Sequence, residues 1–462
     1  MHTIIYRPTY TLLGFLLLAA SCSQDELPPG SNGAEGGRIE FRASLPEVSS
    51  RATEVTGASL DKFQVSSFIV GSSSLSTYFL DKTFSQSAAG KFASLDPECI
   101  WPNGNAVLRF FAFAPSCEEM RAAGGFGNAD FSLLTPAAGE VIDSDEYEMT
   151  DFRVAKDIAS QFDFITATAS GRLLDYEDEG LDLNFQHQLS RIQLKAWSAS
   201  STYDMEIAGV RLGGVGTSGT FNFAAEQDAT GPAKAGRWAT VDKGCVEYVF
   251  SSGDVIVALD KSAGAPVSAG QAVSILGNRI GGEDGYENSA MLIPALNTAW
   301  QYIDNPANGI NHADGMYFSV LVRVIDTTPQ DHGDIVYPYP GDSQGMEVVY
   351  LAVDQATKKN VIARLYKDGE DYFTDPDMTS RFDLEENSAE AKAFGWAALP
   401  VGDEWKPGYV YTYTLNYSDG VGLRDPHDPN PGEPIIRERV LVTVDVAEWK
   451  TGTMTDVSVP RK

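Results

Sequence analysis

The chain has 462 residues, with 64 acidic and 34 basic side chains and a formal net charge of −30. This length predicts two or three domains rather than one. A surface so negative repels nucleic-acid phosphates and anionic lipid head groups, which excludes both as binding partners.

The first 22 residues have the pattern of an export signal. A single Arg7 precedes the apolar run "LLGFLLLAA", which is too short for a spanning helix of about 20 apolar residues. We therefore expect a signal peptide over residues 1–21. Small residues lead to Cys22 in a pattern that resembles a bacterial lipobox, which implies lipid (diacylglyceryl and palmitate) on the Cys22 thiol and an anchor that does not span the membrane. The alternative is a plain signal peptide with an incidental cysteine.

A tether and a strand follow the lipobox. Residues 22–37 are acidic and rich in Pro and Gly, which is typical of a flexible tether. The next segment alternates apolar and polar side chains and predicts a strand with one buried face. The residues of that face are Ile39, Phe41, Ala43 and Leu45. Arg51 comes just behind this strand in a Ser-rich segment that is typical of an exposed turn.

The rest of the first half is also rich in strand patterns. Residues 107–113 ("VLRFFAF") are apolar on both faces and predict a central, fully buried strand. Residues 181–196 alternate throughout, but the phase flips near Ser190, which predicts a β-bulge. A Ser-rich break follows, so we place the two domains at residues 38–199 and 200–462.

The second half continues with strands. Alternating or apolar runs occupy residues 316–325, 346–353 and 409–417, and the terminal run carries Val440, Val442 and Val444 on one face. The best helix candidate is the short segment 388–399. Strands joined by Gly-, Pro- and Asp-rich turns predict an all-β protein with two β-sandwiches in series.

Three cysteines remain after Cys22, namely Cys99, Cys117 and Cys245. An odd count in an exported protein leaves at least one thiol unpaired. Cys99 and Cys117 flank a strong strand and could pair, and buried free thiols are the favoured alternative.

The sequence carries no catalytic signature. It has no HExxH, Walker A or GxSxG motif and no paired CxxC. His187 lies on an apolar strand face, which is typical of a core imidazole. The acidic segments 175–186 and 424–433 predict solvated or rigid loops, since Gln186 cannot supply the bidentate carboxylate of a calcium loop. The Gly-rich segment 212–219 predicts a strand connector. We expect no enzyme activity, no cofactor and no metal.

Several segments together resemble the fimbrillins, the subunits of type V pili of Bacteroides-type bacteria. These are "IEFRASLP…SSRATEV", "IWPNGNAVLRFFAFAP", "FDFITATA" with "LNFQHQLSRIQLKA", and "KPGYVYTYTLNY" with "VTVDVAEW". The resemblance implies two transthyretin-like β-sandwich domains and a structural, adhesive role. It also implies a surface-exposed lipoprotein of the cell outer membrane and other fimbrillin subunits as partners, with a host protein or glycan as a further one.

The resemblance also implies how the subunit assembles. In polymerising fimbrillins an arginine-specific protease removes the first strand, and a strand from a neighbouring subunit takes its place. Arg51 is the best match to the cut position. We expect the first strand to be detachable and not held between two neighbours. The candidate donor strands carry Val440, Val442 and Val444 or Val457 and Val459.

The sequence is compatible with two roles for the protein. A shaft or tip subunit would lose its first strand, whereas a permanently lipid-anchored surface protein would keep both the strand and the lipid. The second class includes a pilus base anchor and a module that binds glycan or host protein.

Overall fold

The computed structural model describes most of the chain between residues 37 and 448. The described ranges are 37–44, 60–71, 74–88, 91–102, 106–122, 132–133, 141–142, 147–155, 158–176, 180–223, 236–249, 257–260, 265–276, 289–301, 315–338, 345–353, 360–369, 371–382, 392–436 and 440–448. Cys22, Leu45, Arg51, Val457 and Val459 lie outside these residues.

The N-terminal strands form a nine-stranded sheet in the order β10-β1-β4-β3-β2-β5-β9-β11, with β7 paired to β3. Their bounds are β1 (Glu40–Ser44), β2 (Lys62–Val70), β3 (Leu75–Ala88), β4 (Lys91–Ala93), β5 (Leu108–Ala114), β7 (Val141–Ile142), β9 (Ile165–Gly171), β10 (Leu181–Asn184) and β11 (Gln186–His187). Only Phe185 separates β10 from β11, although they stand at opposite ends of the strand order. The sheet therefore curls back on itself around its own core.

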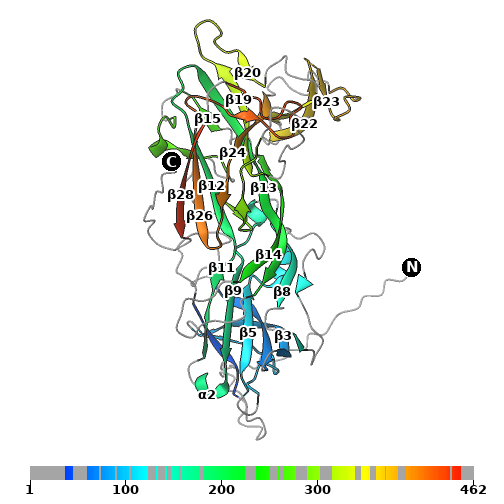
Figure 1. Cartoon of the computed structure of the whole chain (residues 1–462), viewed down its shortest axis with the longest axis vertical. Helices are drawn as coiled ribbons and strands as arrows, with labels where there is room; N and C mark the ends of the chain where they lie inside the picture. Colours follow the sequence, from blue (N-terminus) through cyan, green and yellow to red (C-terminus); the bar gives the residue numbers. More distant parts are fainter. Residues whose placement is uncertain are drawn as a thin grey trace, which may run out of the picture.

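A twelve-stranded sheet runs through the other end of the molecule (Figure 1). Its main order is β23-β22-β21-β24-β19-β13-β8-β6, with β14 and β15 on β13, β20 on β19 and β27 on β24. Their bounds are β6 (Ser132–Leu133), β8 (Glu148–Arg153), β13 (Tyr203–Asn222), β14 (Arg237–Val249), β15 (Val257–Leu259), β19 (Tyr317–Asp326), β20 (Ile335–Tyr337), β21 (Met346–Val353), β22 (Asn360–Asp368), β23 (Asp371–Phe373), β24 (Lys392–Pro400) and β27 (Leu423–Arg424).

A five-stranded sheet packs beside it in the order β16-β12-β26-β28, with β17 on β12. Its strands are β12 (Ser190–Trp197), β16 (Val273–Ser274), β17 (Ala290–Leu292), β26 (Tyr409–Asn416) and β28 (Leu441–Glu448), and β18 (Leu296–Asn297) pairs with β25 (Asp403–Glu404) as a separate ribbon. The described helices are short: α1 (Cys117–Ala122), α2 (Leu173–Tyr176), η1 (Ile158–Ser160) and η2 (Ala269–Gln271). Within the described ranges, none of them has the length and hydrophobicity to cross a bilayer.

Two large apolar cores lie on opposite faces of β5. Phe110 belongs to the core enclosed by the nine-stranded sheet, and Phe111 and Phe113 belong to the core shared with the other sheets. Every residue of β5 is buried. The prediction of a central strand over residues 107–113 is therefore confirmed, and so is the nearly all-β fold.

Three local predictions were wrong. The phase flip near Ser190 is not a bulge, because β11 and β12 belong to different sheets and the chain crosses between them there. The helix candidate at 388–399 contains a strand, β24, which is central between β21 and β19. The Gly-rich segment 212–219 lies inside β13, where Gly213 lets the Tyr317 ring approach to a distance that no Cβ would permit.

Strand pairing also crosses the predicted domain boundary at residues 199–200. β8 pairs with β13, and β12 pairs with β26 along seven residues. The division at 199–200 stays a prediction, but the sheets themselves do not divide there.

Candidate functional site

The first described strand fills a space between two other strands. β1 runs parallel to β10, with Phe41 opposite Leu181 and Ser44 opposite Asn184. On its other side it runs antiparallel to β4, with Phe41 opposite Phe92. We call the space between β4 and β10 the β1 slot.

The inward side chains of β1 complete the aromatic core. Phe41 is fully buried, and its ring centroid lies 4.8 Å from that of Phe84 and 5.1 Å from that of Phe110, in edge-to-face contacts. Phe63 is the third ring of this Phe41 pocket, at 6.1 Å. Ile39 is also buried. Burial of two such side chains stabilises the folded state by about 1.5–3 kcal/mol each.

The outward side chains of β1 form ion pairs on the slot rim. The Arg42 guanidinium donates two hydrogen bonds to Asp182 of β10, at 2.8 and 3.0 Å. Glu40 lies 4.0 Å from the Lys91 ammonium of β4. Gly180 precedes β10 with a φ of +77°, and a Cβ there would lie 3.1 Å from the Glu40 carbonyl oxygen. An acid and a base thus flank Phe41 and each meets the opposite charge on a neighbouring strand.

This placement corrects the expectation that the first strand has a free edge. β1 is hydrogen-bonded on both sides, so it cannot slip out of a sheet edge. Its departure breaks two ladders and opens the Phe41 pocket. Such a strand leaves readily only if another strand replaces it, since replacement restores both ladders.

The last described strand is held much more weakly. Among the described strands, β28 lies at the end of its strand order and pairs with β26 alone, from Leu441 opposite Asn416 to Glu448 opposite Tyr409. Leu441 is 58% exposed and Val442 is 36% exposed. Val440 and Val444 are partly buried against the core. Val442 shares a face with these two valines, so the valine face of β28 is incompletely covered.

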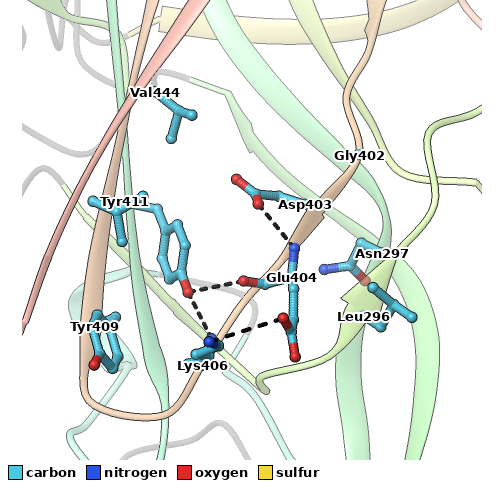
Figure 2. Close-up of a pocket in the computed structure, with 10 residues that line it drawn as sticks. Leu296, Asn297, Gly402, Asp403, Glu404, Lys406, Tyr409, Tyr411 and Val444 are labelled. Carbon is cyan, nitrogen blue, oxygen red and sulfur yellow. Dashed lines mark hydrogen bonds and ion pairs between the residues drawn. The ribbon is translucent and has the colours of Figure 1, made fainter. Parts of the chain in front are cut away.

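A groove of about 610 Å³ opens under this face (Figure 2). Val444 and Val446 of β28 and Tyr409 and Tyr411 of β26 line one side, and the β18–β25 ribbon lines the other. The Tyr411 hydroxyl donates to the Glu404 carbonyl at 3.0 Å and accepts from the Lys406 amide at 2.8 Å. Burial raises the pKa of Tyr411 to about 12, so the hydroxyl stays neutral. We call this the β28 groove.

A buried charge cluster fixes the loop that leads toward β28. Arg211 is 3% exposed, its guanidinium reaches Asp425 at 2.9 Å, and it also pairs with Glu247 and Glu347. Asp425 further accepts hydrogen bonds from Ser319 and from His427. Burial opposes ionisation of Asp425, but the His427 hydrogen bond and the Arg211 charge outweigh it and lower its pKa. Apart from the Asp-rich loop 424–433, no sequence pattern indicates this Arg211 cluster.

The remaining predicted residues are His187 and the three cysteines, of which Cys99 accepts a hydrogen bond from the Ile39 amide at 3.2 Å through its carbonyl oxygen. His187 is buried, and its Nδ1 atom is 2.8 Å from an Asp163 oxygen. Cys99, Cys117 and Cys245 are all free thiols, and Cys99 is buried. Among the described residues no group of His, Cys, Asp and Glu could hold a metal ion.

The chain was compared with known protein families and with curated proteins. The sequence matches the family model described as fimbrillin-like over residues 50–312, more than half of the chain. No curated protein matches it.

The solved structures that the chain matches include proteins from Bacteroides and Parabacteroides. A fimbrial protein from Bacteroides vulgatus is 11% identical with a TM-score of 0.44, and the alignment covers 89% of this chain and 99% of that one. A proposed cell adhesion protein from Parabacteroides distasonis is 11% identical with a TM-score of 0.40 over 89% and 99% of the two chains. Another from Bacteroides ovatus is 12% identical with a TM-score of 0.36 over 91% and 100%. On the strength of the family match, the chain belongs to the fimbrillin-like family.

Proposed function

We propose that the chain is a structural, adhesive subunit of a surface fimbria, in the shaft or at the tip, that assembles by strand exchange. In this proposal the exported chain is lipidated at Cys22 and held at the cell outer membrane. Cleavage after Arg51 then frees the segment that contains β1. Other fimbrillin subunits are the partners.

The observation that supports this function best is the aromatic core that the segment at β1 completes. β1 has only five residues, yet it closes two ladders and supplies Phe41 to the core, and Ile39 just before it is buried in the same core. Burial of those two side chains amounts to about 3–6 kcal/mol, against about 5–15 kcal/mol for the stability of a whole domain. Binding of another strand in the β1 slot is therefore expected to stabilise a subunit that has lost β1.

The position of β28 supports a role as the strand that is donated to a neighbouring subunit. It has one hydrogen-bonded neighbour among the described strands, and Val444 and Val446 line the β28 groove. Removing it breaks one ladder rather than two. Val457 and Val459 belong to the tail beyond β28, which remains an alternative donor.

The two-sided pairing of β1 favours a second candidate function. A strand held on both sides also suits a subunit that keeps it permanently. The chain would then be a lipid-anchored surface protein, either a pilus base anchor or a module that binds glycan or host protein.

Arginine-specific proteolysis distinguishes the two functions. The mature protein is treated with the protease, its new N-terminus is read by mass spectrometry, and its mass in solution is measured by light scattering. The strand-exchange function predicts a new N-terminus at Ala52 and oligomers after the cut. Arg51→Ala should abolish both results, whereas Arg381→Ala, which removes a 70% exposed arginine side chain elsewhere, should leave both unchanged. Intact monomers in all three proteins would favour the anchored protein.

A further inference from the structure

The β28 groove has two unlike walls (Figure 2). One wall consists of side chains from β26 and β28, namely Tyr409, Tyr411, Val444 and Val446, and we call it the apolar wall. The β18–β25 ribbon forms the other wall and carries most of the polar groups. The space between the walls, about 610 Å³, has the size and the mainly apolar surface with a few polar groups that are typical of ligand sites.

The polar wall has an excess of negative charge. Asp403 and Glu404 form β25, and Lys406 is the single basic residue that lines the groove among the described residues. The Lys406 ammonium lies 4.0 Å from the Glu404 carboxylate, and the two side chains are 57% and 62% exposed. An exposed pair of this length contributes little free energy, so a cation on a ligand can compete for Glu404. Two carboxylates and one ammonium leave one negative charge unmatched.

A buried amide on the same wall has an unmet hydrogen-bonding capacity. Asn297 lines the groove from β18 and is 2% exposed. Its Nδ2 atom donates to the Ala295 carbonyl at 3.2 Å, but its Oδ1 atom has no hydrogen-bond partner among the described residues. Buried acceptors are rarely left unpaired, because their desolvation is not compensated. This acceptor therefore indicates a ligand that brings an N–H or O–H donor into the groove.

An extended peptide matches both walls at once. Successive side chains of an extended chain point to opposite sides, so alternating apolar and basic residues present one row to each wall. The apolar row contacts the valines and tyrosines, the basic row meets the carboxylates, and backbone N–H groups supply donors. Pockets for alternate side chains are the usual basis of specificity when a protein binds an extended peptide. Leu296, which is 71% exposed at the groove, adds apolar surface for such a segment.

Other occupants fit the two walls less well. An anionic glycan would be repelled by Asp403 and Glu404, and a neutral glycan would leave their excess charge unmatched. The end of this chain has Val457 and Val459 on one face, but the opposite face then carries Asp456 and Ser458. With its valines on the apolar wall, that segment would bring an acid to the carboxylates.

We propose that the β28 groove binds an extended segment of another protein in which apolar residues alternate with Lys or Arg. The apolar side chains lie against Tyr409 and Val444, and a basic side chain pairs with Glu404. This inference rests on the adhesive part of the proposed function and names the chemistry of a partner. It requires β28 to be in place and does not require cleavage or strand exchange.

Binding of short synthetic peptides to the uncleaved protein tests the charge requirement. The probe is a fluorescently labelled acetyl-Val-Lys-Val-Lys-Val-amide, and its binding is followed by anisotropy. We expect it to bind at least about 10-fold more tightly than the same peptide with Gln in place of Lys, because hydrogen bonds between charged groups are the stronger ones. The peptide with Glu in place of Lys should not bind. Absence of binding by the lysine peptide, or equal binding of the lysine and glutamine peptides, would overturn the proposal.

Two variants that remove the same charge separate the groove from the negative surface as a whole. Glu404→Gln should weaken binding of the lysine peptide about 10-fold. Asp377→Asn removes a carboxylate from an exposed turn elsewhere and should leave the affinity unchanged. The Glu404 side chain is 62% exposed, so its substitution should not disturb folding. Equal affinities of the two variants for the peptide would overturn the placement of the site.

Unlabelled competitors added to wild type test the other occupants. Maltoheptaose, a neutral oligosaccharide, and a peptide with the sequence of residues 453–462 should both fail to displace the lysine peptide. Displacement by the sugar would overturn the peptide as the ligand, and displacement by the second competitor would make the chain's own end the occupant. Because all proteins in these experiments are uncleaved, failure of this proposal leaves assembly by strand exchange untouched. Failure to form oligomers after cleavage at Arg51 would likewise leave the peptide site standing.

Discussion

The first and last described strands of this chain are held in opposite ways. β1 has five residues, two hydrogen-bonded neighbours and a fully buried phenylalanine. β28 has eight residues, one hydrogen-bonded neighbour and a leucine that is 58% exposed. The shorter strand is therefore the more firmly bound of the two.

In the proposed strand exchange, this difference would favour one direction of transfer. A segment that leaves the edge position of β28 and enters the two-sided β1 slot gains a second ladder. The reverse transfer loses it. A subunit that carries a strong acceptor and a weakly held donor is suited to form chains that do not come apart easily.

The largest expected effect comes from emptying the Phe41 pocket. Phe41→Ala should lower the free energy of unfolding by about 3–5 kcal/mol, because it removes a buried ring and leaves a cavity. Val442→Ala in β28 should cost less than about 1 kcal/mol, because that side chain is already 36% exposed. Urea denaturation of the uncleaved protein measures the free energy of unfolding of each variant. Equal decreases in the two variants would contradict the conclusion that β1 is more firmly bound than β28.

The next effect concerns the loop that leads toward β28. Asp425→Ala takes one carboxylate from the buried Arg211 and should destabilise the protein by about 2–3 kcal/mol, since a buried charge loses part of its compensation. Asp371→Ala, which breaks the exposed pair with Arg381, serves as the control and should change stability by less than about 1 kcal/mol. Similar small changes in both would show that the Arg211 cluster does not fix this loop.

A smaller effect is expected at the rim of the β1 slot. Arg42→Ala breaks an ion pair whose two side chains are 41% and 56% exposed, so it should cost at most about 1 kcal/mol. The same urea denaturation applies. A loss as large as that of Phe41→Ala would mean that the rim, rather than the aromatic pocket, holds β1.

The smallest effect is a dependence on pH. The hydrogen bond to Asp425 raises the pKa of His427, so the protonated form is favoured in the folded state. The resulting stability is fully present below the unfolded pKa of about 6.5 and is lost as the pH rises through the higher folded value. His427→Asn should therefore lower the melting temperature at pH 5.5 more than at pH 8.5. An equal decrease at both pH values would contradict this coupling.

Some of these features could be predicted from the sequence and others could not. The alternation over residues 39–45 indicates which face of β1 is buried, and the apolar run 107–113 indicates a central strand. Alternation says nothing about neighbours, however, so the pairing of β1 with both β4 and β10 was not predictable. For the same reason, the phase flip near Ser190 was predicted to be a bulge, although the chain crosses there from one sheet to another.

Tertiary context explains the other errors. Ala- and Lys-rich residues near 392 favour a helix locally, but β24 is buried between two strands, and packing there outweighs propensity. The Arg211 cluster joins residues that are 36, 136 and 214 positions apart in the sequence. No local pattern connects such residues, so only the folded sheets reveal them.

The most direct test of the account is the N-terminal residue of the protein in oligomers recovered from the cell surface. Strand exchange after removal of β1 predicts that mass spectrometry finds Ala52 first, with no lipid and no β1 peptide in the assembled material. Oligomers whose subunits begin with lipidated Cys22 and retain residues 37–44 would contradict it.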